Sequence, residues 1–258
     1  MKSIPEIAKE LFGDNHPAQC GGGHIICLNC YNCHLKGPDR IYNPEKGLAA
    51  VIDATVLKAE ATKKEVTELC HTANNFQTAA VCVNSHFIPL LKELLHEPVK
   101  ICTVINFPLG AGAKNAIVNE AKAVLALGAE EVDLVQNLSA FLSGDYDLDL
   151  QCIADTAILC KEHNALLKVI LETCYLTEEQ IIISCLLAKK AGADFVKTST
   201  GFGSAGATIE NIALMRQVVG PKIGVKAAGG IRTKEQALAM LDVGANRIGA
   251  SSVNAILQ

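Results

Sequence analysis

The sequence predicts an α/β protein built as one closed (β/α)8 barrel over residues 48–258, preceded by an extension over residues 1–47. Eight apolar runs alternate with longer helical patterns, and Gly-Ala pairs close several of those helical patterns. The first run leads into DATVLKAEAT, which has no glycine, whereas an open dinucleotide-binding sheet carries a glycine-rich turn at this point. Barrels of this kind often contain about 250 residues, so the 258-residue chain is long enough for one.

The eight expected strands are short and apolar. Half of all residues are hydrophobic, tryptophan is absent, and small aliphatic residues dominate, which suits parallel strands that are buried on both faces beneath helices. In chain order, the runs cover residues 49–54, 79–84, 100–106, 130–137, 166–173, 194–200, 222–228 and 246–251.

The segments between these runs have helical periodicity. In residues 116–129, for example, Ile117, Ala121 and Val124 recur at helical spacing, and Gly128 ends the pattern. Gly192 and Gly244 follow two later helical patterns in the same way. Repeated units of helix, glycine and strand are typical of the TIM barrel, in which each strand is followed by a helix.

Residues 1–47 lie outside the barrel pattern and form two parts. The first is a short helix with an apolar stripe, which consists of Ile4, Ile7, Ala8, Leu11 and Phe12. We expect this helix to cap the N-terminal face of the barrel; the alternative is that it docks a partner. The second part is a loop rich in cysteine, histidine and glycine.

Four of the 11 cysteines, Cys20, Cys27, Cys30 and Cys33, crowd into this loop with the spacing C-x6-C-x2-C-x2-C. Tetrahedral sets of Cys and His ligands hold such loop-rich segments together, so we expect a structural zinc site. An iron–sulfur cluster, a disulfide pair and four unliganded thiols are the alternatives. The other seven cysteines lie in apolar segments, where buried free thiols are expected.

Charge and hydropathy exclude several classes of protein. The net charge is -4, and no block of Lys and Arg forms a stripe for nucleic acid or a patch for a membrane surface. The N-terminus lacks the apolar stretch of a signal peptide, and no run reaches the roughly 18 apolar residues of a membrane span. We therefore expect a cytoplasmic protein that binds neither nucleic acid nor membrane.

Five ionisable residues interrupt the expected strands: Asp53, Asp133, Lys168, Lys197 and Lys226. Lysine is rarely buried without a partner or a function. The three lysines are separated by two equal intervals of 29 residues, which predicts neighbouring strands and related heights. Burial and mutual repulsion lower the pKa of a lysine, and such a lysine is the nucleophile that carbonyl chemistry needs. The alternative is a buried network of salt bridges.

Glycines and serines are prominent in the loops after the last three strands, at 199–208, 228–233 and 249–252. Such loops expose backbone N–H groups that bind anions, and barrels often hold phosphate after the seventh and eighth strands. Gly229, Gly230, Ser251 and Ser252 therefore predict a phosphate site. Arg232 either contributes to it or is a solvated neighbour.

Around these residues the sequence resembles the deoxyribose-phosphate aldolase family. The pair FVKTSTGFG (195–203) and GVKAAGG (224–230) is the most specific part of the resemblance. The stretches DATVLKAEAT (53–62), TVINFPLGA (103–111), EVDLVQN (131–137) and LLKVILET (166–173) extend it over nearly all of residues 48–258. Ala54, Asn106 and Gln136 depart from the family pattern, which leaves the preferred acceptor open.

The resemblance implies roles for the site residues. Lys197 would form a Schiff base, Lys226 would depress its pKa, and Asp133 would move protons together with Lys226 and a water. Supporting residues would be Asp53, Lys168, Cys82 and Thr198. The phosphate would be held by Gly203, Gly229, Gly230, Ser251 and Ser252.

The implied reaction is the reversible cleavage of 2-deoxy-D-ribose 5-phosphate to D-glyceraldehyde 3-phosphate and acetaldehyde. It requires no metal and no organic cofactor, and the resemblance also implies a homodimer. Two alternatives remain: a related Schiff-base barrel aldolase that acts on another phosphorylated sugar, and a non-catalytic, metal- or redox-responsive binding protein on a barrel scaffold.

Overall fold

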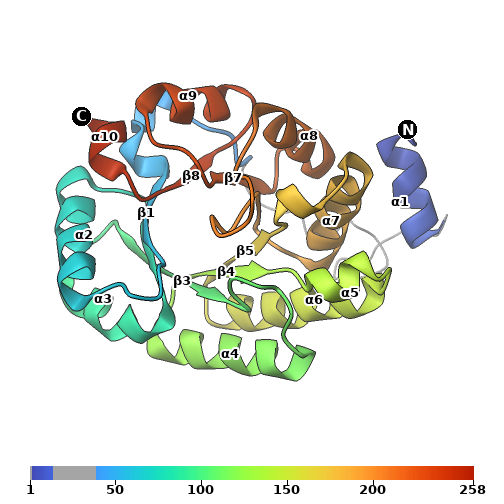
Figure 1. Ribbon diagram of the computed structural model, residues 1–258, viewed down its shortest axis with the longest axis horizontal. Coiled ribbons are helices and arrows are strands. Elements are labelled where there is room, and N and C mark those ends of the chain that lie inside the picture. The colour runs from blue at the N-terminus through green and yellow to red at the C-terminus, as the bar shows by residue number, and fades with distance from the viewer. Residues whose placement is uncertain (1, 14–38) are drawn as a thin grey trace.

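The computed structural model describes residues 2–13 and 39–258, and most of these residues form a closed barrel of eight parallel strands in sequential order (Figure 1). This confirms the predicted (β/α)8 fold. Within the described part of the chain, no helix is both long and apolar enough to cross a membrane.

Each strand overlaps the apolar run that predicts it. The first strand begins later than expected because residues 49–51 form a short 3-10 helix, and it continues through the β-branched residues Thr55 and Val56. The strands are β1 (Ile52–Val56), β2 (Ala80–Val83), β3 (Lys100–Ile105), β4 (Glu131–Val135), β5 (Leu166–Ile170), β6 (Phe195–Lys197), β7 (Gly224–Ala228) and β8 (Arg247–Ala250).

Helices surround the barrel (Figure 1). Several begin at a threonine whose side chain accepts a hydrogen bond from the first turn, as Thr62, Thr177 and Thr233 do. Gly128 and Gly192 end two helices in the left-handed region, as predicted. The helices of the barrel are α2 (Lys63–Phe76), α3 (Ile88–Leu94), α4 (Lys114–Leu127), α5 (Leu138–Leu142), α6 (Tyr146–Glu162), α7 (Glu178–Ala191), α8 (Ile209–Val219), α9 (Lys234–Asp242) and α10 (Val253–Leu257).

The N-terminal helix, α1 (Ile4–Phe12), packs against α7 on the outside of the helical ring (Figure 1). The expectation that it caps the N-terminal face of the barrel is therefore wrong. Ile7 and Ala8 are buried in the outer core, and the Lys190 ammonium lies 4.1 Å from the centre of the Phe12 ring. An apolar stripe shows that one helix face is buried, but it does not identify the surface that buries it.

Arg40 contacts the entrance to β6, at the N-terminal face of the barrel. The Arg40 guanidinium lies 2.7 Å from the Asp194 carboxylate and 4.9 Å from the centre of the Phe195 ring. Phe195 points into the barrel, where the glycine at position 224 makes room for it: a Cβ there would lie 2.1 Å from the ring. The segment before the barrel thus helps to close this face.

Asp149, in the first turns of α6, is a buried carboxylate away from the barrel interior. Its Oδ1 atom accepts a hydrogen bond from the backbone N–H of Asn137 at 2.8 Å, and its Oδ2 atom has no hydrogen-bond partner among the described residues. Burial raises the pKa of Asp149 to about 7, although the hydrogen bond from Asn137 acts in the opposite direction. An aspartate in the unfolded chain has a pKa of about 4. The folded protein therefore keeps a proton that the unfolded chain has lost, and its stability falls as the pH rises through this window.

We expect Asp149→Asn to raise the free energy of unfolding by roughly 2–4 kcal/mol at about pH 8, because it removes the buried charge. The amide oxygen can still accept from the Asn137 N–H. Little gain is expected at about pH 4, where the native carboxyl is already protonated. Denaturant unfolding at both pH values measures this difference. Asp147→Asn, at an exposed site in the same helix, is the matched control. Equal effects of Asp149→Asn at both pH values would contradict the assignment.

Candidate active site

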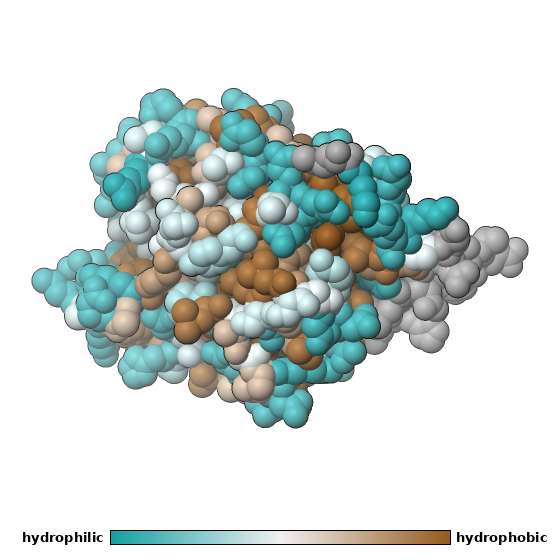
Figure 2. All heavy atoms as spheres, turned by 45° about the vertical axis from the view of Figure 1, so that its right-hand side comes forward, coloured by the Kyte–Doolittle hydropathy of each residue, from teal (hydrophilic) through white to brown (hydrophobic). Residues whose placement is uncertain are grey.

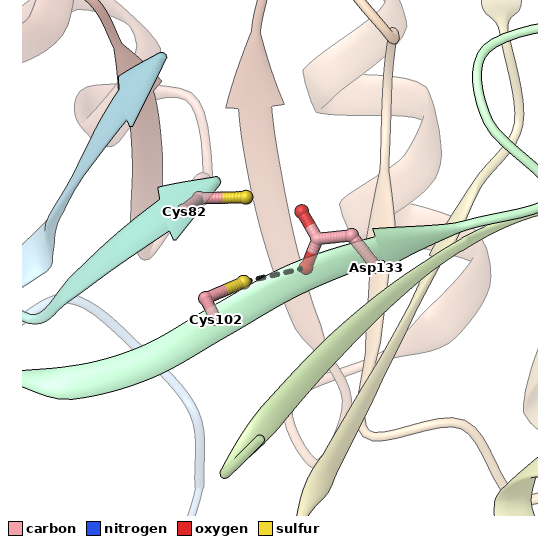
Figure 3. Close-up of side chains that lie close together, drawn as sticks. All are labelled: Cys82, Cys102 and Asp133. Carbon is pink, nitrogen blue, oxygen red and sulfur yellow. Dashed lines mark hydrogen bonds between the residues drawn. The ribbon is translucent and has the colours of Figure 1, made fainter. Parts of the chain in front are cut away.

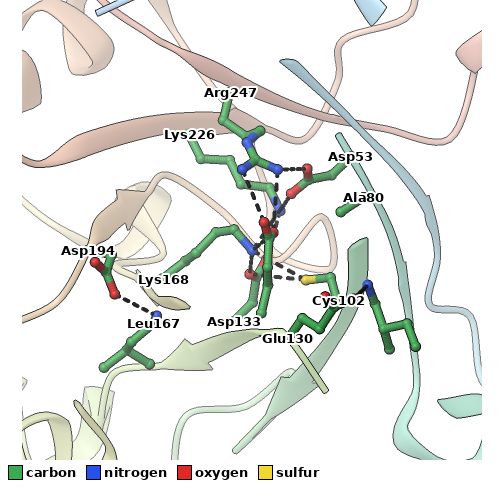
Figure 4. Close-up of polar contacts among 12 residues, drawn as sticks. Asp53, Ala80, Cys102, Glu130, Asp133, Leu167, Lys168, Asp194, Lys226 and Arg247 are labelled. Carbon is green, nitrogen blue, oxygen red and sulfur yellow. Dashed lines mark hydrogen bonds and ion pairs between the residues drawn. The ribbon is translucent and has the colours of Figure 1, made fainter. Parts of the chain in front are cut away.

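Seven charged side chains from six strands converge inside the barrel. Figure 4 labels Asp53, Asp133, Lys168, Lys226 and Arg247 among them. Because side chains of a strand alternate between its two faces, the inward positions are occupied by residues two apart, such as Glu131 and Asp133 in β4. Six of the seven are almost fully buried, and the Arg247 side chain is 12% exposed. The cluster consists of Asp53, Glu131, Asp133, Lys168, Lys197, Lys226 and Arg247.

Asp133 is the centre of this cluster. Its Oδ1 atom accepts a hydrogen bond from the Lys168 ammonium at 2.8 Å, and its Oδ2 atom accepts from Lys197 and Lys226, each at 2.8 Å. Burial alone would raise the pKa of Asp133, but the Coulombic attraction of the three ammonium groups lowers it well below its usual range. The carboxylate is therefore ionised and connects all three strand lysines.

A second group of contacts lies closer to the start of the strands. The Arg247 guanidinium binds Asp53 at 2.7 Å and Glu131 at 3.1 Å, and Glu131 also contacts the Lys168 ammonium at 2.6 Å. Burial opposes ionisation of Asp53, but Arg247, Lys226 and Lys168 lower its pKa. Glu131 and Arg247 were not among the predicted site residues. The alternation that places Asp133 inside the barrel could have identified Glu131, two residues earlier.

The equal spacing of the three lysines does not place all of them at one height. Lys197 pairs with Lys226 across β6 and β7, as expected. Lys168 pairs with Asp133 and with Phe195, two residues before Lys197. Lys168 therefore lies deeper, because closing a barrel requires staggered strands.

The expected lowering of the lysine pKa is also wrong for Lys168 and Lys226. Burial disfavours the charge on Lys226, but Asp133 and Asp53 outweigh this effect and raise its pKa. At Lys168, Asp133 and Glu131 likewise outweigh burial, and its pKa is well above its usual range. The sequence showed the lysines but not how many carboxylates surround each of them.

A cavity of about 420 Å³ opens at the carboxyl ends of β1 and β6–β8. Lys197 lines it, together with Thr200 and with the glycines at positions 229 and 230. Lys168 and Lys226 do not line it, although Lys226 shares the Oδ2 atom of Asp133 with Lys197. Lys197 is thus the strand lysine that a molecule in this cavity can reach.

Three of the five predicted phosphate-binding residues line this cavity: Gly229, Gly230 and Ser251. The two glycines have φ angles of +86° and +82°, in the left-handed region that glycine adopts most readily. Ser252 lines a neighbouring cavity beside α2 instead. Arg232 lies at the rim, where it is exposed.

Gly203 lies away from the cavity lining, against the Glu172 and Cys174 side chains. A Cβ atom at position 203 would lie 2.7 Å from the Cys174 Sγ atom. The buried Glu172 carboxylate accepts hydrogen bonds from the Thr200 hydroxyl and from its backbone N–H. This carboxylate, which the sequence analysis missed, holds the loop that carries Thr200.

The supporting residues are also buried close to the cluster. Thr198 connects β6 to β7, because its hydroxyl donates to the Ala228 carbonyl at 3.0 Å and accepts from the Ala228 N–H at 3.1 Å. Cys82 is fully buried and lies beside Cys102 and Asp133. All seven cysteines of the barrel are free thiols, as predicted, although Cys174 is only partly buried.

The three departures from the family pattern do not line the cavity. Ala54 follows the inward-facing Asp53 and packs in the core between barrel and helices. Asn106 has a φ angle of +53°, a conformation that asparagine tolerates better than most residues, and its amide donates to the Val135 carbonyl. The Gln136 amide donates to the Leu171 carbonyl at 2.8 Å. All three have structural roles.

The predicted zinc ligands Cys20, Cys27, Cys30 and Cys33 lie outside the described residues.

Known proteins resemble the chain over the whole barrel. A family model described as DeoC/LacD family aldolase matches residues 48–257. The deoxyribose-phosphate aldolase of Thermococcus gammatolerans is 54% identical over 208 residues, which cover 80% of this chain and 92% of that protein. The deoxyribose-phosphate aldolase of Thermococcus kodakarensis is 52% identical over 211 residues, covering 81% of this chain and 94% of that protein.

A solved structure agrees with these relatives. The tetrameric deoxyribose-phosphate aldolase of Aeropyrum pernix superimposes with a TM-score of 0.75 at 32% identity, covering 83% of this chain and 91% of that chain. The sequence motifs, the barrel and the buried lysine–aspartate cluster lead to the same family. The chain belongs to the DeoC/LacD family of aldolases.

Proposed function

We propose that this chain is a class I aldolase that reversibly cleaves 2-deoxy-D-ribose 5-phosphate to D-glyceraldehyde 3-phosphate and acetaldehyde. The similar proteins from both Thermococcus species are deoxyribose-phosphate aldolases, which supports this substrate. The observation that carries the mechanism is the position of Lys197. Among the three strand lysines, it is the one that lines the cavity.

Lys197 is the proposed Schiff-base lysine. Its amine must be neutral to attack C1 of the open-chain sugar, and Lys226 lies beside it on the same Asp133 oxygen. Loss of water from the adduct gives an iminium ion. When the bond between C2 and C3 breaks, its electron pair moves to the iminium nitrogen and leaves an enamine on Lys197.

Asp133 and Lys226 are the proposed proton-transfer groups, acting with a water molecule. The C3 hydroxyl loses its proton as glyceraldehyde 3-phosphate leaves, and the enamine carbon later gains one. Hydrolysis of the resulting imine releases acetaldehyde and restores the Lys197 amine. General acid–base catalysis of this kind contributes about 10²–10⁴-fold to a rate. Every step uses protein side chains and water, so the reaction requires no cofactor.

The phosphate is proposed to bind to backbone N–H groups of Gly229 and Gly230 and to the Ser251 hydroxyl. These residues and Lys197 line the same cavity, so one substrate can reach both groups. Asp53 and Lys168 would hold Asp133 and Lys226 in place through the buried ion pairs. Gly203 would act indirectly, through its close packing against Glu172 and Cys174.

Borohydride trapping tests the proposal. The protein is mixed with 2-deoxyribose 5-phosphate or with acetaldehyde, reduced, digested and analysed by mass spectrometry. We expect a stable adduct on Lys197 that is absent in Lys197→Leu. An adduct confined to Lys168 or Lys226, or no adduct on folded protein, would overturn the assignment.

The alternative of a related aldolase shares this chemistry, and a panel of phosphorylated aldehydes and ketoses separates the two. Activity with another phosphorylated sugar that exceeds activity with 2-deoxyribose 5-phosphate would favour it. A non-catalytic binding protein would form no adduct with any aldehyde in the panel.

We also propose that the chain forms a homo-oligomer, with a homodimer as the simplest form. The Aeropyrum pernix relative is tetrameric. Large hydrophobic side chains are exposed at Leu109, Tyr175 and Phe202, and Figure 2 shows groups of apolar residues among polar ones near the middle of the face in view. Such surfaces are typical of protein interfaces. Light scattering of the purified protein tests the prediction.

Three further expectations stay predictions. They are the division of the chain at residue 47, a cytoplasmic location, and a structural zinc site in the extension, with an iron–sulfur cluster as its alternative. Metal analysis of tag-free protein tests the last of these, and fluorescence of a tagged full-length chain in cells tests the location.

A further inference from the structure

Two thiols lie inside the barrel close to Asp133, the central carboxylate of the charged cluster. Cys82, Cys102 and Asp133 come from the consecutive strands β2, β3 and β4. In Figure 3 both sulfur atoms point toward the Asp133 carboxylate. The two sulfur atoms and one carboxylate oxygen all lie within 4.8 Å of one another. The Cys102 thiol donates a hydrogen bond to Asp133 at 3.4 Å.

We propose that Cys82, Cys102 and Asp133 form a binding site for a thiophilic divalent cation such as zinc. Thiolate and carboxylate are ligands that zinc takes in proteins, with Zn–S distances of about 2.3 Å and Zn–O distances of about 2.0–2.2 Å. Ligand atoms around a tetrahedral ion are therefore about 3.5–4 Å apart. The separations in this group need only small side-chain rotations to reach that geometry.

A second group of similar composition shows why the thiol pair is the better site. Asp53, Cys102 and Glu131 also place their ligand atoms within 4.8 Å of one another. The Lys168 ammonium, however, already lies among them, 2.6 Å from Glu131, 3.8 Å from Asp53 and 3.3 Å from the Cys102 sulfur. A cation of the protein itself therefore contacts all three members of that group, whereas in the thiol-pair group the same ammonium contacts two members, Cys102 and Asp133.

The surrounding charges permit a metal at the thiol pair. The cluster has four cationic side chains and three carboxylates, which would repel an added cation. A divalent ion that binds two thiols releases two protons, so the total charge of the cluster does not change.

Occupation of this site would inhibit the aldolase. Asp133 holds Lys168 through Oδ1 and both Lys197 and Lys226 through Oδ2, so a metal bound to either oxygen competes with at least one of these contacts. This consequence rests on the proposed function, whereas metal binding itself does not. The chain would then have a built-in inhibitory site for zinc-like ions, separate from the four cysteines of the extension.

Cadmium titration tests the site. The full chain is used with Cys20, Cys27, Cys30 and Cys33 all replaced by serine, so that the extension contributes no thiolate. We expect one equivalent of Cd²⁺ to produce the ultraviolet thiolate-to-cadmium absorption band. The same addition should lower the aldolase rate by about 100-fold or more, because Asp133 is removed from proton transfer.

Single replacements locate the ion. In the same background, Cys82→Ser or Cys102→Ala should abolish the stoichiometric band, and each variant should lose most of its inhibition relative to its own metal-free rate. Cys70→Ala is the matched control, because Cys70 is an equally buried free thiol between α2 and the barrel. It should keep both effects. A band that survives the loss of both Cys82 and Cys102 would overturn the proposal.

Because a barrel variant could misfold, a further measurement uses the protein with an unmodified barrel. X-ray absorption of the Cd²⁺-loaded protein in the serine background should show two sulfur ligands and at least one oxygen. A shell of oxygen and nitrogen alone would exclude the site. The two proposals can be refuted independently. A two-sulfur shell in a protein without aldolase activity would refute only the proposed aldolase function. An active protein that does not bind Cd²⁺ through thiolates would refute only the proposed metal site.

Discussion

Lys197→Met is expected to lower kcat/KM for cleavage of 2-deoxyribose 5-phosphate by on the order of 10⁴-fold or more, as removal of a covalent nucleophile does in other enzymes. Methionine keeps the length and apolar stem of the side chain but cannot form an imine. Asp133 keeps two ammonium partners, Lys168 and Lys226, so its charge remains compensated. A steady-state assay that detects acetaldehyde measures the loss, and thermal unfolding checks that the fold is intact.

Lys226→Met is the informative comparison. This lysine shares the Oδ2 atom of Asp133 with Lys197 but does not line the cavity. The variant should still form a borohydride adduct on Lys197, at a reduced rate, whereas Lys197→Met should form none. An adduct on Lys226 in the Lys197→Met variant, with substantial activity, would reverse the two roles.

The fold and the main site residues were predictable because their signals are local. A charged residue inside an apolar run contradicts the composition of a buried strand, and Asp133, Lys168, Lys197 and Lys226 all give this signal. Loop glycines at positions 229 and 230 give a similar local signal, since the structure holds both in the left-handed region.

Features that depend on partners from other strands were not predictable in the same way. The direction of the pKa shift at Lys226 depends on Asp133 and Asp53, which are distant in the sequence. The depth of Lys168 depends on the stagger of the barrel. The position of α1 depends on an apolar surface of α7, which its own stripe does not identify.

The roles of the two inward carboxylates of β4 can be separated by one pair of substitutions. Asp133→Asn leaves three ammonium groups around a neutral amide, and Glu131→Gln leaves Lys168 and Arg247 without one of their carboxylates. Each change is expected to lower the free energy of unfolding by about 3–5 kcal/mol, as breaking a buried ion pair does. Denaturant unfolding measures both losses.

Activity should distinguish the two variants even though their stability losses are similar. Asp133 contacts Lys197 directly, so Asp133→Asn should lower kcat/KM by about 10²–10⁴-fold. Glu131 contacts Lys168 and Arg247 instead, so Glu131→Gln should stay within about tenfold of the parent when assayed where both variants are folded. If both variants lost activity equally at matched folded fractions, the cluster would act through its total charge, and Asp133 would have no specific part in proton transfer.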